Sequence, residues 1–168
     1  DLANNRRLKT LPKGAAQTSS DHDWEYRYDN ANRLQYIIDP AGNTTEYRYY
    51  PDDSVDALID AKSQTTSYTY FPTGRRKTLS YPDGATYHYT YDPNGNRETL
   101  TDPLNQTVTS VYDELNRETQ RSYSNNVGDV DAIQQIAFSA YDANNNLEAV
   151  SVTTSARSYS VNYTYDDF

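Results

Sequence analysis

The sequence predicts an all-β protein in which tandem β-hairpins of 21 residues build a long, curved antiparallel sheet. In the first strand of each repeat, tyrosine alternates with polar residues. This period of two is typical of a β-strand whose two faces differ. Residues that favour turns return in the same register between the strands. Five tyrosines at 21-residue steps set the interval: Tyr28, Tyr49, Tyr70, Tyr91 and Tyr112.

One unit is clearest in the middle of the chain. Tyr87–Tyr91 alternates as a strand, and Asp92–Gly95 then has the composition of a type I turn. Pro93 presets φ at the second turn position, and Gly95 can adopt the left-handed conformation that closes the turn. Arg97–Thr101 is the expected returning strand, and a second turn follows it. Each unit is therefore predicted to run strand, turn, strand, turn.

Further columns keep the same step. The second turn opens at Asp39, Asp60, Tyr81 and Asp102. Late in that turn stand Gly42, Ser63, Gly84 and Asn105. The equivalent place in the first turn holds Asn32, Asp53, Gly74, Gly95 and Asn116. Gly and Asn dominate this last column, as expected for residues that tolerate positive φ. The returning strand carries an aliphatic column at Ile37, Leu58, Leu79 and Leu100.

The repeats divide the chain into three regions. Residues 1–23 are a degenerate repeat and a loop, 24–123 are regular repeats, and 124–168 are irregular repeats with an enlarged hairpin loop at about 124–134. This pattern predicts about six units and roughly 12 strands. Helix is expected nowhere at length, although Val130–Ala137 could form a turn or two. Because the chain lacks methionine and ends like the start of another repeat, it is expected to be a fragment or a processed product.

Composition argues against several classes of partner. The formal net charge of −9 disfavours binding to nucleic-acid phosphates or to an anionic membrane surface. No apolar run approaches the roughly 20 residues of a spanning helix. Cysteine is absent, which excludes disulfides and thiolate metal sites. The mean hydropathy is −1.00, yet 18 tyrosines can bury large rings while their hydroxyls reach water or a hydrogen-bond partner.

The acidic residues that follow tyrosines are candidate metal ligands or paired catalytic acids. They are Asp29, Asp92, Asp113, Asp142 and Asp166. The favoured interpretation is that each opens a turn and accepts hydrogen bonds from neighbouring backbone N–H groups. Asp129 and Asp131 are the best remaining metal candidates, although a solvated loop is preferred there. His22 and His88 are the only histidines, and no nucleophile or metal motif accompanies them. No catalytic, metal-binding or cofactor-binding residue is therefore predicted.

The tyrosine ladder has two interpretations. Regularly spaced rings on a sheet could stack on sugar rings, as in carbohydrate- or choline-binding repeats. Alternatively, cross-strand aromatic pairs hold adjacent repeats together, each contributing roughly 0.2–1 kcal/mol. The second interpretation is favoured because the same tyrosines must supply most of the core. Arginines near the first turn are expected to bond neighbouring carboxylates or to stack on tyrosine rings. These are Arg33, Arg75, Arg97 and Arg117.

The motif Tyr-x-Tyr-Asp-x-x-Gly/Asn-Arg-Leu resembles the YD repeats of RHS-repeat proteins. The stretches that carry it are Tyr26–Leu34, Tyr89–Arg97, Tyr112–Arg117 and Tyr141–Leu147. Asp39–Asn43 is similar to the second turn of that family, and the resemblance covers about residues 24–168. The family includes bacterial polymorphic toxins, the C component of insecticidal toxin complexes and the extracellular teneurins.

This resemblance implies a strip of a β-shell, in which the sheet spirals into a hollow wall around a C-terminal toxin or effector domain. The chain would then be a non-enzymatic structural module, secreted or at the cell surface, with a bacterial export system implied. Its partners would be the remainder of the parent RHS shell and the enclosed cargo domain, together with self-association through exposed sheet edges. The alternative is an extracellular module that binds carbohydrate or protein through exposed tyrosines.

Neither self-cleavage nor a toxin activity carries over from the family to any residue. The family cleaves itself at a stretch of the type Pro-x-x-x-x-Asp-Pro-x-Gly-Leu, which this sequence lacks. The residues expected to define the repeat structurally are Tyr28, Asp29, Tyr49, Tyr70, Tyr91, Asp92, Gly95, Tyr112, Asp113, Tyr141, Asp142, Gly42 and Gly84.

Overall fold

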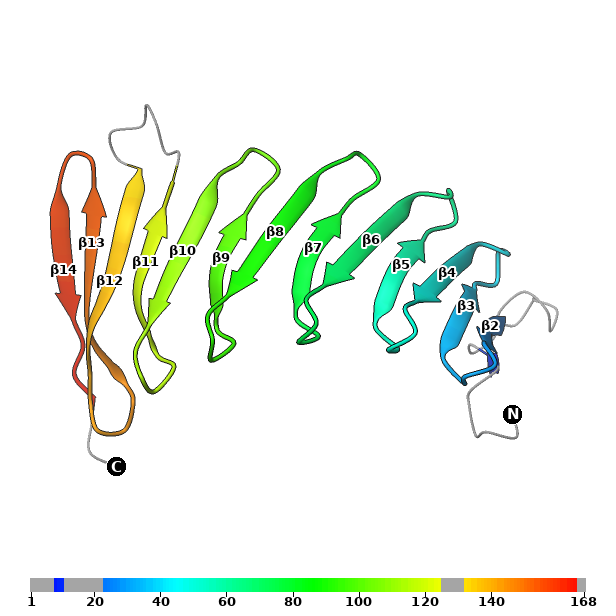
Figure 1. The fold of residues 1–168 in the computed structure, drawn as a ribbon, viewed down its shortest axis with the longest axis horizontal. Coiled ribbons are helices and arrows are strands. Elements are labelled where there is room, and N and C mark those ends of the chain that lie inside the picture. Colours follow the sequence, from blue (N-terminus) through cyan, green and yellow to red (C-terminus); the bar gives the residue numbers. More distant parts are fainter. Residues whose placement is uncertain (1–7, 11–22, 125–131, 166–168) are drawn as a thin grey trace, which may run out of the picture. The chain divides into compact units, whose positions relative to one another are not determined.

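The computed structural model describes residues 8–10, 23–124 and 132–165, and all regular structure in these ranges is β-strand (Figure 1). The chain divides into two compact units, Asp1–Gly84 and Ala85–Phe168. Within each unit, consecutive strands pair antiparallel. The predicted all-β class with tandem antiparallel hairpins is confirmed. The described residues include no helix of the length and apolarity that crossing a membrane requires.

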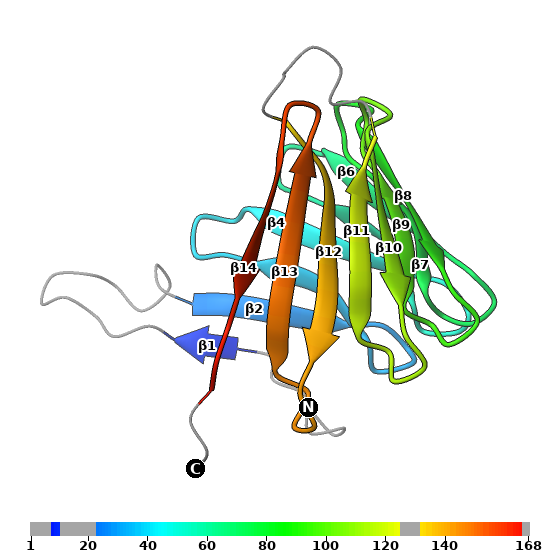
Figure 2. The same cartoon turned by 90° about the vertical axis from the view of Figure 1, so that its left-hand side faces the viewer.

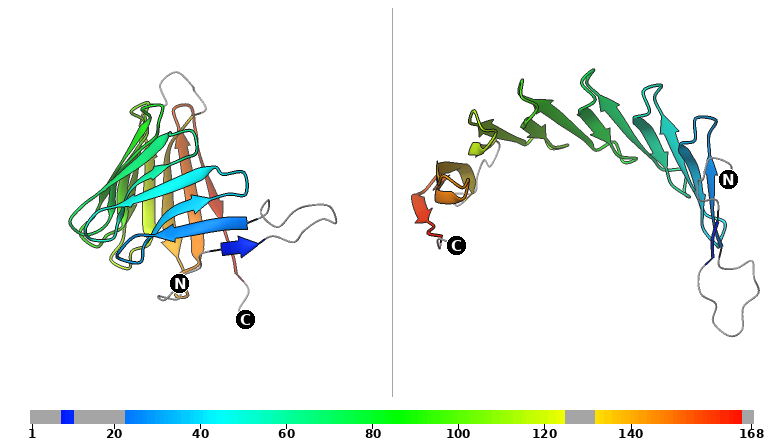
Figure 3. Two further views of the ribbon diagram at one scale, coloured as in Figure 1. Left: turned by 90° about the vertical axis from the view of Figure 1, so that its right-hand side faces the viewer. Right: turned by 90° about the horizontal axis from the view of Figure 1, so that it is seen from below.

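The strands follow the order of the sequence. The first unit contains β1 (Leu8–Thr10), β2 (Asp23–Tyr28), β3 (Leu34–Ile38), β4 (Thr44–Tyr49), β5 (Val55–Ile59), β6 (Thr65–Tyr70) and β7 (Arg76–Ser80). The second contains β8 (Thr86–Tyr91), β9 (Arg97–Thr101), β10 (Thr107–Tyr112), β11 (Glu118–Tyr123), β12 (Ile133–Tyr141), β13 (Leu147–Thr154) and β14 (Ser158–Asn162). Figure 2 shows β11 to β14 side by side, and the left panel of Figure 3 shows β1 and β2 running in opposite directions.

The repeat length follows from the lengths of its parts. A six-residue strand such as β4, a five-residue strand such as β5 and two five-residue turns account for the 21-residue step. The pairing shifts register at the tyrosine that ends the first strand, as between Arg48 and Tyr49. The same shift recurs at the ends of β2, β6, β8 and β10. Such a β-bulge bends the strand and increases its local twist.

Tyrosine and leucine lie on one face of the sheet, a point that the sequence pattern alone did not settle. Tyr47 lies directly opposite Leu58, and Tyr68 lies directly opposite Leu79. Directly opposed residues of an antiparallel pair project from the same face, so each tyrosine packs against the aliphatic column. This tyrosine and leucine face is the apolar side of the repeats.

Hydroxyl pairs mark the other face. The Oγ1 atoms of Thr69 and Thr78 lie 2.6 Å apart on neighbouring strands. Those of Thr90 and Thr99 lie 2.7 Å apart in the equivalent place of the next repeat. Threonine hydroxyls satisfy one another across the strands, so this face can remain in contact with water.

The core is thin. Among the described residues, the buried apolar side chains are Ala57, Leu79 and Val152, and no side chain is fully buried. Most tyrosines are half-buried, which is the expected state for a single layer of strands that gains its apolar contacts from neighbouring repeats. The stability of such an array is therefore the sum of small contributions from many partly buried side chains.

The structure departs from the expected elements in two places. The described residues contain 14 strands where roughly 12 were expected, because β1 persists in the degenerate N-terminal region and β14 follows the last hairpin. A short helix at Val130–Ala137 is wrong for the residues described there, since Ile133–Ala137 belongs to β12 and Ile136 pairs with Val152. Most of residues 1–23 and of the predicted loop at 124–134 lies outside the described residues.

Candidate functional site

Each turn is built around the residue that opens it. At the first turn of the first regular repeat, the Asn32 N–H donates to the Asp29 carbonyl at 3.0 Å, and the Asp29 N–H donates to the Arg33 carbonyl at 2.9 Å. The Asp29 carboxylate also accepts from the N–H groups of Ala31 and Arg33, both at 2.9 Å. The same pair of carboxylate bonds forms at Asp39, Asp60, Asp102, Asp113 and Asp142. Oδ1 of each of these carboxylates is thus committed to its own turn.

The fourth residue of each five-residue turn has positive φ. The first turn uses Asn32 at 62°, Gly74 at 78° and Gly95 at 94°. The second turn uses Gly42 at 84° and Gly84 at 87°. Gly, and less readily Asn or Asp, adopts this conformation at low cost, which explains the residue types in both columns except at Ser63, whose φ is 61°.

The fifth residue of the turn links one repeat to the next. Arg33 donates from Nε to the Asp29 carboxylate at 2.8 Å, and its Nη1 reaches the Asp53 carboxylate of the following repeat at 2.8 Å. Nη1 also donates to the Tyr50 carbonyl at 3.1 Å. A single guanidinium therefore closes its own turn and holds the neighbouring one, which a planar multi-donor group does well.

The same link recurs in the second unit. Asn96 donates to the Asp92 carboxylate at 2.9 Å and to Oδ1 of Asn116 at 2.7 Å. Arg117 bonds Asp113 at 2.7 Å and reaches Oδ1 of Asn145 at 3.1 Å. Sequence reasoning named Arg97 for this role, but Arg97 begins β9 and Asn96 occupies the linking position. The 21-residue step already places Asn96 in the same column as Arg33 and Arg117, and this register could have identified it as the linking residue.

The tyrosine that ends the first strand forms a second link between repeats. The Tyr49 hydroxyl donates to the Leu34 carbonyl at 2.6 Å, and the Arg33 guanidinium carbon lies 4.7 Å from the ring centroid. Equivalent hydroxyl bonds run from Tyr112 to Arg97, from Tyr141 to Glu118 and from Tyr165 to Leu147. Each joins one repeat to the returning strand of the repeat before it. Hydroxyls used in this way support the structural interpretation of the tyrosine ladder.

The ionisable groups of these links have shifted pKa values. Backbone hydrogen bonds from Arg33 and from Arg117 lower the pKa of Asp29 and of Asp113, respectively. The side-chain amide of Asn96 lowers the pKa of Asp92 in the same way. These bonds favour the charged carboxylate. In contrast, burial raises the pKa of tyrosines in the ladder, namely Tyr49, Tyr70 and Tyr141.

We expect the turns to make the chain sensitive to acid. A carboxylate whose pKa is lower in the folded than in the unfolded state contributes stability above the unfolded pKa of about 3.9, and that contribution is lost as pH falls through the folded value. Thermal unfolding followed by circular dichroism should therefore show a midpoint that falls steeply below about pH 4.

Two variants of one turn isolate this effect. Asp113→Asn keeps an oxygen acceptor but removes the titration, so it should lower the midpoint at pH 7 and flatten its fall in acid. Glu114→Gln makes the same charge change at the next, exposed position of the turn and should leave the profile unaltered. A midpoint that is constant or rises from pH 5 to pH 2 in the unmodified chain would contradict the prediction.

The residues predicted to define the repeat lie at its corners. The tyrosines Tyr28, Tyr49, Tyr70, Tyr91, Tyr112 and Tyr141 end the strands β2, β4, β6, β8, β10 and β12. The aspartates Asp29, Asp92, Asp113 and Asp142 open the turns that follow. The structure thus brings Tyr49, Tyr112 and Tyr141 beside the start of the returning strand of the preceding repeat, through bonds to Leu34, Arg97 and Glu118. The tyrosine hydroxyls bond to residues far away in the sequence, and no sequence pattern predicted these partners.

The other candidates do not converge on a chemical centre. In the ranges that the structure describes, no three His, Cys, Asp or Glu side chains are grouped to hold a metal. His88 is exposed in β8, opposite Thr101. His22, Asp129, Asp131 and Asp166 lie outside the described residues. The absence of catalytic, metal and cofactor residues stays a prediction.

Taken together, the fixed turns and repeat-to-repeat links define a tandem-repeat β-protein in which each hairpin is held by its sequence neighbours. Residues 72–107 match the family model of the RHS Repeat. The same tyrosine, turn and linking positions continue on both sides of this segment. No protein with a curated description matches the chain.

Several solved structures are similar in fold. A crystal structure of TcdB2-TccC3-Cdc42 matches with a TM-score of 0.70 and 15% identity, covering 87% of this chain and 9% of that one. A crystal structure of TcdB2-TccC3 gives a TM-score of 0.69 and 15% identity, with coverage of 87% and 9%. The Photorhabdus luminescens Tc holotoxin pore with a TccC3 variant gives 0.65 and 14%, with coverage of 77% and 7%. This chain thus spans less than a tenth of each neighbour, and the likeness is one of fold.

Proposed function

We propose that this chain is a segment of the wall of an RHS-repeat shell, which in the parent protein encloses a C-terminal toxin or effector domain. The chain itself is a structural repeat module. The observation that carries the proposal is the link between repeats, in which Tyr49 bonds to Leu34 and Arg33 bonds to Asp53. Because the side-chain link recurs from Asn96 to Asn116 and from Arg117 to Asn145, hairpins can be added one after another to give a continuous wall.

A wall of this kind acts by containment. Backbone ladders close the gaps between strands, and the tyrosine and leucine face packs each hairpin against its neighbours. The mechanism needs no catalytic residue, and we propose that the segment is non-enzymatic. The similar structures are complexes of TcdB2 with TccC3, which supports a parent protein that works as part of a toxin assembly outside the producing cell. Its partners would be the rest of the shell and the cargo domain.

Protease access in the full-length parent protein tests containment directly. One recognition site for a sequence-specific protease is placed in the proposed cargo domain, and a second is placed in the turn at Leu104, whose side chain is 74% exposed. We expect rapid cleavage at the turn, and cleavage in the cargo only after denaturant opens the wall. Equal cleavage rates at both sites in the folded protein would rule out containment.

We also propose that this chain associates with itself through β14. Among the described strands β14 pairs with β13 alone, and all five of its residues are exposed. An open strand edge is a template for another strand. Sedimentation velocity should therefore show species larger than the monomer as concentration rises.

A matched pair of lysine variants distinguishes pairing at the strand edge from nonspecific hydrophobic association. Val161→Lys places a charge on the edge strand and should restore the monomer. Val111→Lys makes the same change at a similarly exposed residue of β10, which has a partner on each side, and should leave association unchanged. A monomeric unmodified chain at high concentration would contradict the proposal.

A further inference from the structure

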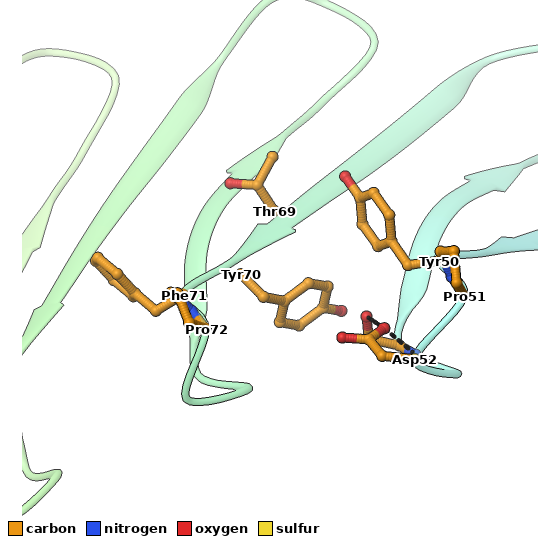
Figure 4. A pocket seen from close by; sticks show the side chains of 8 residues that line it. Tyr50, Pro51, Asp52, Thr69, Tyr70, Phe71 and Pro72 are labelled. Atoms are coloured by element: carbon orange, nitrogen blue, oxygen red, sulfur yellow. Dashed lines mark hydrogen bonds between the residues drawn. The ribbon is translucent and has the colours of Figure 1, made fainter.

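Two neighbouring repeats depart from the turn pattern. Tyr50 and Phe71 occupy the positions where Asp29 and Asp92 open the turns on either side. Both keep the backbone bonds of the turn, since the N–H groups of Tyr50 and Phe71 donate to the fifth turn residue at 2.9 and 2.8 Å. The aromatic side chains are therefore not needed to close the turns. With Tyr70 they line a surface pocket of about 460 Å³ in the first unit (Figure 4).

The pocket is an aromatic corner with an acidic wall. The rings of Tyr50 and Tyr70 meet edge to face, with centroids 6.3 Å apart and planes at 88°. Figure 4 shows the Tyr70 ring directed toward Asp52. The Asp52 carboxylate is held by the Ser54 N–H at 3.1 Å and the Ser54 hydroxyl at 2.5 Å. Pro51 and Thr69 complete this side of the pocket.

The charge of the site favours a cation. Hydrogen bonds from Ser54 lower the pKa of Asp52, so its carboxylate is ionised at neutral pH. Interaction with the Asp56 carboxylate raises the pKa of the Tyr50 hydroxyl, so a second carboxylate lies near this side chain. The eight lining residues, all of them described, include no cationic side chain. The Lys77 ammonium lies 5.9 Å from the centroid of Phe71, so that ring already has a cationic partner and the recognising rings are those of Tyr50 and Tyr70.

We propose that this pocket binds an alkylammonium group, with a methylated ammonium head as the best fit. Aromatic faces attract cations that are weakly hydrated, and a nearby carboxylate adds charge complementarity. The volume lies within the range of small-molecule sites. The Tyr50 hydroxyl donates to the Tyr68 carbonyl at 3.2 Å and the Ser54 hydroxyl is bonded to Asp52, which leaves the rings and the carboxylate as the recognising groups.

Titration of the chain with choline, followed by NMR of the tyrosine ring protons, tests the proposal. The control is 3,3-dimethyl-1-butanol, which has nearly the same shape as choline but carries no charge. We expect the dissociation constant of choline to be lower by about fivefold or more, because only the cation gains the interaction with the rings and the carboxylate. Equal binding of the two compounds, or tighter binding of glucose, would overturn it.

Three variants assign the effect to this pocket. Tyr50→Asp restores the residue that opens the equivalent turns, so the chain should fold and choline binding should fall by about tenfold. Tyr81→Asp makes the same substitution at a second turn, where Asp39 and Asp60 stand in other repeats, and should leave binding unchanged. Asp52→Asn keeps an acceptor for Ser54 but removes the charge, and should weaken binding by about threefold. Unchanged binding by folded Tyr50→Asp would refute the site.

Discussion

Replacing Leu79 with alanine is expected to lower the free energy of unfolding by about 2–4 kcal/mol. The Leu79 side chain is 9% exposed and lies directly opposite Tyr68 in the apolar face. Its removal loses buried apolar surface and leaves a cavity that the hydrogen-bonded strands β6 and β7 cannot close. Urea unfolding followed by circular dichroism at pH 7 measures the loss.

Leu104→Ala is the matched control for this experiment. Leu104 is 74% exposed in a second turn, so the same truncation there should change stability by less than about 0.5 kcal/mol. If Leu79→Ala were as mild as Leu104→Ala, the aliphatic column would not be the core. The contrast matters because few described side chains are buried, and each of them should carry a large share of the stability.

Truncating Tyr49 to alanine is expected to cost about 2–3 kcal/mol, and Tyr49→Phe about 1 kcal/mol. The alanine variant loses the ring, the stacked Arg33 guanidinium and the hydroxyl bond to Leu34. The phenylalanine variant keeps the ring and loses only the bond. The difference between the two therefore separates packing from the repeat-to-repeat hydrogen bond.

Amide hydrogen exchange shows where the effect of Tyr49→Phe falls. Protection should decrease most at β3 and β4, which the lost bond connects. Tyr159→Ala serves as the control, because Tyr159 is 50% exposed on β14 and its loss should cost less than about 1 kcal/mol. Equal costs at Tyr49 and Tyr159 would show that the ladder bond does not hold repeats together.

The sequence by itself determined the repeat, the order of strands and turns, and the places of positive φ. These features are local. Alternation along a strand such as Thr86–Tyr91 reports its two faces, and glycine at Gly84 or Gly95 reports a backbone conformation that most residues avoid. The resemblance of Tyr89–Arg97 to the RHS repeat rested on the same local pattern and lies within the segment that matches the family model.

Only the tertiary structure decided which groups meet between repeats. The bulge at Tyr49 fixes how its hydroxyl reaches Leu34, and no local pattern encodes that pairing. The linking role of Asn96 also depends on a neighbour 20 residues away, Asn116. Ile133–Ala137 became a strand because β11 and β13 pair with it on either side, overriding its local preference. Contacts between distant residues set these outcomes, so they had to be seen in the folded chain.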